Sequence, residues 1–150
     1  MPRPGAESKN STNMVGIVVV GHGRLAEEMV RTLEGVLGQV DALEAVVNEP
    51  ADPRERVRAR IEEAARRVDR GRGVLILSDM LGDTETNQAL AFARTSGAEV
   101  VAGVNMPMLI KLANARKQTD ARALAGLLRR YGQEHIVWAT EAPAVVRKAQ

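Results

Sequence analysis

Cysteine is absent from this 150-residue chain, and Trp, Tyr and Phe each occur only once. The absence of thiols excludes disulfide bonds and thiolate metal sites. Three aromatic residues are too few to supply the stacking surfaces with which proteins bind single-stranded nucleic acids. We therefore expect no nucleic-acid partner, and a core built from Val, Leu, Ile, Ala and Met.

A strong net charge and a long apolar run are also lacking. Twenty-one basic residues nearly balance nineteen acidic ones, which leaves a net charge of +2. No apolar stretch approaches the ~20 residues that are needed to span a bilayer. The first thirteen residues are polar and lack the apolar segment of a secretory signal. We expect a cytoplasmic protein that is not embedded in a membrane.

The length suits one domain with an ordinary core, and the composition (45% apolar, 27% charged) is typical of a globular protein. Residues 1–13 contain Pro, Gly, Ser and Asn and are predicted to form a disordered extension. Residues 14–140 are predicted to form the folded domain, and residues 141–150 a flexible tail.

Short apolar runs alternate with segments of helical periodicity, which predicts an α/β fold with a parallel sheet between two layers of helices. Asp52, Thr84 and Thr119 are the predicted N-caps of three of the helices. In a doubly wound sheet of order 2-1-3-4, the first and third strands are neighbours. The expected strands are residues 15–20, 43–47, 74–77 and 100–104, with a possible fifth at 135–139.

His22, one of only two histidines, lies in a Gly21-His22-Gly23 turn directly after the first strand. Ligands and reaction chemistry collect at the carboxyl ends of such strands. Asp79 follows the third strand, and neighbouring strands lie only ~4.8 Å apart, so we expect the two side chains to meet. A carboxylate bonded to one ring nitrogen fixes the tautomer and leaves the other nitrogen as a nucleophile.

The loop after Asp79 leads into a helix whose first backbone N–H groups can bind a phosphate. The predicted phosphate-binding residues, called the 80–84 loop below, are Met80, Leu81, Gly82, Asp83 and Thr84. With His22 and Asp79 as the catalytic pair, the sequence predicts a phosphohistidine site without a metal or cofactor. The same residues also suit ordinary roles as a structural histidine, a turn aspartate and a helix cap.

Three blocks resemble the IIA domain of the mannose-family sugar phosphotransferase system, in matching order and spacing. They are residues 16–28 (GIVVVGHGRLAEE), 73–87 (GVLILSDMLGDTETN) and 102–109 (AGVNMPML). The resemblance implies that His22 takes a phosphoryl group from the phosphocarrier protein HPr and passes it to a IIB component, with Asp79 orienting the ring. It also implies a homodimer that exchanges an antiparallel fifth edge strand, here residues 135–139.

The second block departs from the family pattern where the phosphate should bind. Asp83 stands where the family usually has a glycine, and Glu85 where it has a proline. A carboxylate within ~5 Å of a phosphoryl group would cost roughly 3 kcal/mol at an effective dielectric constant of 20. Thr84 conservatively replaces a serine.

Two alternatives to phosphotransfer therefore stay open. The first is a regulatory binding protein of the same fold, with weak or no phosphotransfer because of Asp83 and Glu85. The second is a small tetrapyrrole metal chelatase, since those enzymes also carry a Gly-His-Gly turn after their first strand. The chelatase hypothesis is weaker because His135, the other histidine, lies at the wrong end of the chain.

Overall fold

The computed structural model describes residues 13–142. The predicted extension (1–13) and tail (141–150) lie outside the described residues except for Asn13, Glu141 and Ala142. Strands and helices alternate in the order β1 (Gly16–Val20), α1 (Leu25–Leu37), β2 (Leu43–Val46), α2 (Arg54–Val68), β3 (Val74–Ser78), α3 (Thr84–Ser96), β4 (Glu99–Ala102), α4 (Met106–Ala115) and α5 (Ala121–Glu134). Within this range, no helix has both the length and the apolar character needed to cross a bilayer.

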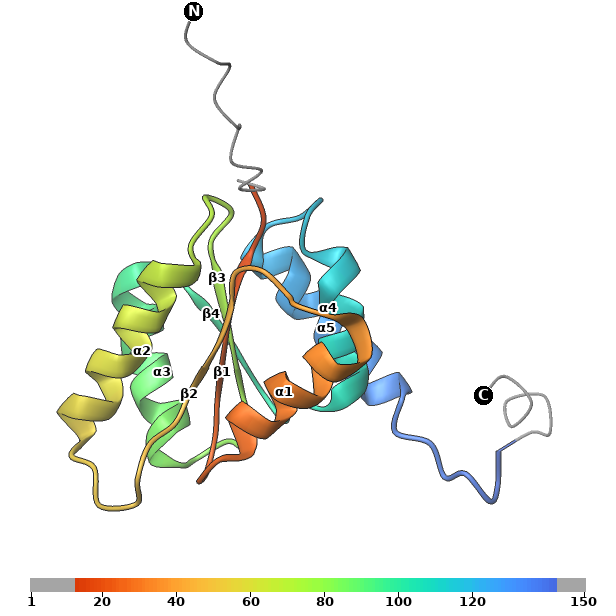
Figure 1. Ribbon diagram of the computed structural model, residues 1–150, viewed down its shortest axis with the longest axis horizontal. Coiled ribbons are helices and arrows are strands. Elements are labelled where there is room, and N and C mark those ends of the chain that lie inside the picture. The colour runs from red at the N-terminus through yellow and green to blue at the C-terminus, as the bar shows by residue number, and fades with distance from the viewer. Residues whose placement is uncertain (1–12, 143–150) are drawn as a thin grey trace, which may run out of the picture.

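The four strands are parallel and lie in the order β2-β1-β3-β4, which confirms the predicted sheet. Helices α2 and α3 cover one face of the sheet, and α1, α4 and α5 cover the other (Figure 1). The strands end in register, with Val20 of β1 beside Val46 of β2 and Ser78 of β3. The loops that follow these three strands therefore leave the sheet at one common edge.

The central strands are buried on both faces, as parallel strands between two helical layers must be. The sheet has a hydrophobic core on each face. Val18 and Val20 belong to the core under α2 and α3, whereas Ile17 and Val19 belong to the core under α1, α4 and α5. This alternation follows from the two-residue period of a strand. The result is a fixed pair of strands, β1 and β3, from which the loops at the common edge emerge.

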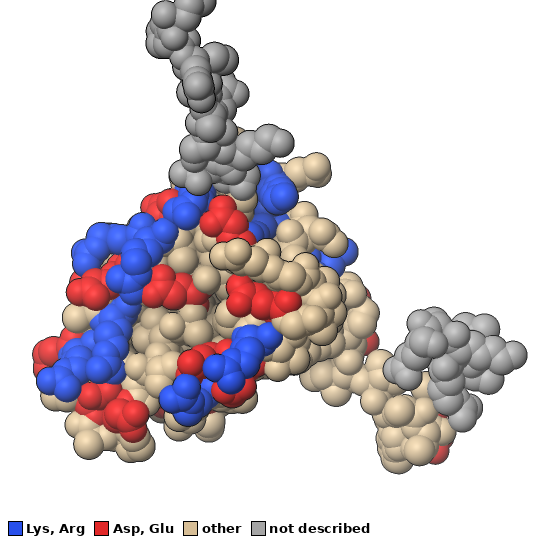
Figure 2. Space-filling model, in the orientation of Figure 1, with Lys and Arg blue, Asp and Glu red and all other residues tan. Residues whose placement is uncertain are grey.

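Helix α2 presents a solvated face of mixed charge. Its arginine side chains are interleaved with acidic ones along the surface seen in Figure 2. Arg58 and Glu62 form an ion pair one turn apart at 2.9 Å, and Arg67 pairs with Glu44 of β2. The basic residues of this helix are thus largely balanced by carboxylates on the same surface.

The predicted N-caps are each displaced by one residue. Pro53, not Asp52, precedes α2, and the Asp52 carboxylate instead accepts hydrogen bonds from the Glu49 N–H and from Arg60. Asp83 caps α3 in place of Thr84. Where an aspartate and a threonine are adjacent, the aspartate is the stronger capping residue. The same preference places Asp120 rather than Thr119 at the start of α5.

Residues 135–139 do not form a strand in the single chain. Helix α5 continues to Glu134, and the following segment leads away from the sheet without pairing to any strand of residues 13–142 (Figure 1). Its apolar side chains are largely exposed, at 78% for Ile136 and 75% for Trp138. Pairing of this segment with a second copy of the chain stays a prediction.

Candidate functional site

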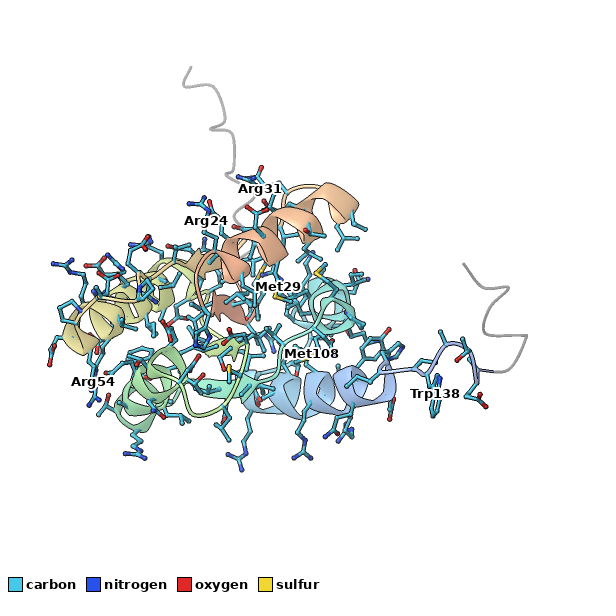
Figure 3. The ribbon with its side chains drawn as sticks, turned by 90° about the horizontal axis from the view of Figure 1, so that it is seen from below. Arg24, Met29, Arg31, Arg54, Met108 and Trp138 are labelled. Atoms are coloured by element: carbon cyan, nitrogen blue, oxygen red, sulfur yellow. The ribbon has the colours of Figure 1, made fainter. Side chains whose placement is uncertain are left out.

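The loops after β1 and β3 bring His22 and Asp79 into contact across 57 residues of sequence. Nδ1 of His22 lies 2.7 Å from Oδ2 of Asp79, and the backbone N–H of His22 donates to the same oxygen at 2.9 Å. Figure 3 views the molecule from this edge of the sheet, with the first turns of α1 and α2 marked by Arg24 and Arg54. The pair predicted from the strand order is therefore present.

Glycines on both sides of His22 allow this approach. A Cβ atom at position 21 would lie only 3.1 Å from Cγ of Asp79, tighter than an ordinary contact. Gly23 has a φ of 54°, a conformation that side chains with a Cβ rarely adopt. The chain can thus turn sharply after β1 and still hold the His22 backbone against the carboxylate.

The two groups shift each other's titration. The hydrogen bond and charge of Asp79 raise the pKa of the His22 imidazole above its usual value. Burial pushes the pKa of Asp79 upward, but hydrogen bonds from His22 and from the Met80 N–H outweigh it and leave this pKa lowered. Because Asp79 stays ionised and holds Nδ1, the lone pair of the neutral ring is on Nε2. The His22 side chain is 55% exposed, so a partner can reach it.

Asp83 brings a second carboxylate to the same ring nitrogen. Its Oδ2 lies 3.3 Å from Nδ1 of His22, and its side chain is only 6% exposed. Oδ1 accepts a hydrogen bond from the Thr86 N–H at 2.7 Å, which caps α3. One of the backbone N–H groups expected to bind a phosphate is therefore already occupied by a carboxylate of the chain itself.

Thr86 is a positioning residue that the sequence analysis missed. Its buried hydroxyl donates to the Met80 carbonyl at 2.6 Å and is hydrogen-bonded to Ser78 Oγ at 2.9 Å. These bonds tie the 80–84 loop to the end of β3. Thr86 and Ala89 are three residues apart on α3 and are both buried, so they share one face of the helix. This helical spacing could have indicated that Thr86 faces inward.

The rest of the 80–84 loop is open to solvent. Met80 and Leu81 are 54% and 72% exposed, and Gly82 turns the chain with a φ of 97°. Thr84 is the exposed first residue of α3. Of the five predicted residues, Gly82, Asp83 and Thr84 line the pocket at His22, and Asp83 is the one whose side chain is directed to the imidazole.

A pocket of about 360 Å³ adjoins His22, and its walls are acidic. Glu49 and Asp52 contribute from the loop after β2, and Asp83 and Glu85 from the start of α3. Neither Glu49 nor Asp52 is among the site residues predicted from the sequence. Their position could have been predicted from the strand order, because β2 lies beside β1 and its carboxyl end is at the same edge of the sheet.

The second histidine is remote from this site. His135 ends α5, where its Nδ1 lies 2.8 Å from the Tyr131 carbonyl and its ring stacks on the Tyr131 ring at a centroid distance of 3.8 Å. Among the described residues, the group that includes His22 and could hold a metal contains only Asp79 and Asp83 besides. The geometry therefore gives no support to a chelatase with two histidine ligands.

Comparison with known proteins connects this geometry to one family. A family model described as "PTS system fructose IIA component" (EIIA-man) matches residues 16–127. The "PTS system mannose-specific EIIAB component" of Escherichia coli K12 is 31% identical over 103 residues, which are 68% of this chain and 32% of that protein. The chain thus spans about a third of the length of this relative. The "PTS system fructose-specific EIIA component" of Bacillus subtilis 168 is 24% identical over 122 residues, covering 81% of this chain and 84% of that protein.

Solved structures share the fold. A mannose/sorbose-specific IIA subunit from Enterococcus faecalis superimposes with a TM-score of 0.75 and 25% identity, over 83% of this chain and 93% of that one. A phosphotransferase system component EIIA from Streptococcus agalactiae gives a TM-score of 0.77 at 22% identity, over 86% of this chain and all of that one. The four-stranded sheet and its helices are therefore the architecture of these proteins.

Proposed function

The chain belongs to the mannose- and fructose-type IIA family of the sugar phosphotransferase system, and from that premise we propose that His22 carries a phosphoryl group on Nε2. The observation that supports this most directly is the 2.7 Å contact between Nδ1 and Asp79 Oδ2. It directs the lone pair of the neutral ring to Nε2, the nitrogen that a partner can approach. Members of the family act in phosphotransfer, and this chain shares that general role.

The proposed donor is the phosphohistidine of HPr. Nε2 of neutral His22 attacks the phosphorus atom, and the N–P bond of the donor breaks, returning an electron pair to the donor imidazole. The His22 ring gains positive charge while Nδ1 keeps its proton. The carboxylate of Asp79 is already in place to stabilise that charge, so no reorganisation is needed during the reaction.

The proposed acceptor is a IIB component, to which the same steps in reverse order deliver the phosphoryl group. The printed name of the Escherichia coli relative, an EIIAB component, supports this partner. On this proposal the protein acts in the cytoplasm, in phosphoenolpyruvate-dependent sugar phosphotransfer or in its regulation.

Intact-mass spectrometry tests the proposal directly. The chain is incubated with phosphoenolpyruvate, enzyme I and HPr, beside His22→Ala and an active IIA domain as a positive control. We expect one phosphoryl group on the wild type and none on the variant. Equal labelling of both, or labelling of neither while the control is phosphorylated, would contradict the proposal.

A regulatory binding protein is the second candidate, and the position of Asp83 favours it. The carboxylate of Asp83 occupies the Thr86 N–H and lies beside Nδ1, so an incoming phosphoryl group meets a negative charge instead of an open helix N-terminus. The double variant Asp83→Gly/Glu85→Pro restores the family residues. Faster phosphorylation of this variant would show that the loop limits transfer, and an unchanged rate would remove that explanation.

We also propose that the segment after α5 pairs with a second copy of the chain, as the family resemblance implies. The exposed side chains of Ile136, Val137 and Trp138 support this, because a monomer would leave them in water. Light scattering coupled to size exclusion should give a dimer for the wild type and a monomer for Trp138→Asp. A monomeric wild type at micromolar concentration would overturn the proposal.

A further inference from the structure

Three potential ligand atoms converge at the edge of the sheet. His22, Asp79 and Asp83 each offer one ligand atom within 4.8 Å of the others, and Nδ1 of His22 lies 2.7 Å from Oδ2 of Asp79 and 3.3 Å from Oδ2 of Asp83. Ligands at 2.0–2.2 Å from a tetrahedral Zn²⁺ are about 3.4 Å apart. The two distances from Nδ1 are therefore close to the spacing of ligands around one such cation.

The oxygen Oδ2 of Asp83 has no hydrogen-bond partner in the described chain. It is fully buried, in a side chain that is only 6% exposed, and it points toward Nδ1 of His22. A buried charge is costly unless it is paired or coordinates a metal. Asp79, in contrast, is fully bonded, since its Oδ1 accepts from the Met80 N–H and its Oδ2 from His22.

The charges of the three groups match a divalent cation. Both carboxylates lie beside Nδ1 of the neutral imidazole and share its single N–H. The three groups together therefore carry two negative charges. Glu49 and Glu85, on the walls of the adjoining pocket, add to the negative potential that attracts cations. One histidine with two carboxylates suits transition-metal ions such as Zn²⁺ and Mn²⁺. The exposed side of the site leaves room for water as a fourth ligand.

We propose that His22, Asp79 and Asp83 bind a divalent transition-metal cation, and that bound metal and phosphorylation of His22 exclude each other. The metal takes the lone pair of Nδ1, so the ring proton moves from Nδ1 to Nε2 and the ring stays neutral. Nε2 then has no lone pair with which to attack phosphorus. This exclusion rests on the proposed function, whereas metal binding itself does not.

Isothermal titration calorimetry with ZnCl₂ tests the binding. The full chain is first treated with EDTA and dialysed. We expect one Zn²⁺ per chain, and at least a tenfold weaker affinity for Asp83→Ser, which keeps a capping oxygen but lacks the second one. The matched control, His135→Asn, lies far from this site and should bind as the wild type does. Absence of binding to the wild type, equal binding by Asp83→Ser, or loss of binding in His135→Asn would overturn the proposal.

A phosphorylation assay with and without Zn²⁺ tests the exclusion. One equivalent of Zn²⁺ should slow labelling of the wild type at least tenfold and leave Asp83→Ser within twofold of its metal-free rate. Equal slowing of both proteins would mean that Zn²⁺ acts on the donor proteins, and would overturn the exclusion. A wild type that takes no phosphoryl group without metal would contradict the proposed function alone, because calorimetry measures the metal site independently.

Discussion

The two histidines of this chain lie in regions that give the imidazole side chain different interaction partners. His22 follows the central strand β1, and its partners Asp79 and Asp83 come from the far side of a strand crossover. His135 follows helix α5, and its partners are the carbonyl and ring of Tyr131, four residues earlier. The end of a parallel strand collects groups from distant sequence, whereas the end of a helix offers a histidine mainly its own last turn.

This difference decides what each imidazole can do. A carboxylate stabilises positive charge on the ring, which favours the phosphorylation that we propose for His22. A backbone carbonyl fixes the orientation of the ring but supplies no full charge. Both histidines are exposed, so exposure alone does not distinguish them.

Replacing the carboxylate of Asp79 should reduce the difference between His22 and His135 most. Asp79→Asn keeps the shape but loses the charge that stabilises the phosphorylated ring, and we expect phosphorylation by HPr to fall about 100-fold or more. His135→Gln serves as the matched control and should stay within twofold. Rapid-quench measurement of labelling gives both rates, and an Asp79→Asn rate close to that of the wild type would show that the charge of this residue is unimportant.

Loosening the loop that carries Asp79 should have a smaller effect. Thr86→Val keeps the size of the side chain but leaves the Met80 carbonyl and the Ser78 hydroxyl without their partner. We expect a loss of about 1–2 kcal/mol in the free energy of unfolding, measured by urea denaturation. Thr95→Val, at an exposed hydroxyl near the end of α3, is the control and should change stability much less.

The protonation of His22 should also differ from that of a histidine without a carboxylate partner. Because Asp79 raises the pKa of His22, this imidazole should titrate above the ordinary value of 6.5 in an NMR titration of EDTA-treated protein. The proposed phosphoryl acceptor is the neutral ring, so labelling should rise with pH through that raised pKa. In Asp79→Asn the titration should move back toward the ordinary value. An unmoved His22 pKa would show that Asp79 is not the cause.

The smallest effect is expected at the other histidine. Tyr131→Leu removes the ring that stacks on His135, and aromatic pairs of this kind contribute about 0.5–1.5 kcal/mol. We expect a stability loss in that range and a phosphorylation rate within twofold of the wild type. A large loss of labelling would mean that the region after α5 supports the site at His22 after all.

Much of this architecture is predictable from short-range patterns. Apolar runs between helical segments predict the parallel sheet, and the strand order then places Asp79 beside His22. The cap of α3 is Asp83 and not the predicted Thr84, because an aspartate is a stronger capping residue than an adjacent threonine. The sequence places acidic residues near the proposed phosphate site but does not determine that one carboxylate lies 3.3 Å from Nδ1.

The segment at 135–139 illustrates a different limit. Its apolar residues suit a strand, but a strand needs a neighbour with open hydrogen-bonding groups, and α5 leads the chain away from the sheet before one is met. The strand propensity of these residues therefore does not determine whether a neighbouring strand is present for them to pair with. Glu49 and Asp52 were missed for a related reason, since their place in the pocket depends on the pairing of β2 with β1.

The register between β1 and β3 also governs when the chain acquires its chemistry during folding. His22 and Asp79 can meet only after these two strands have paired, and parallel pairing over a long crossover is among the slower steps of folding. A slip of one residue would turn the strand side chains to the opposite face and separate the pair. A partly folded chain thus lacks the contact between His22 and Asp79, which forms together with the central strand pair.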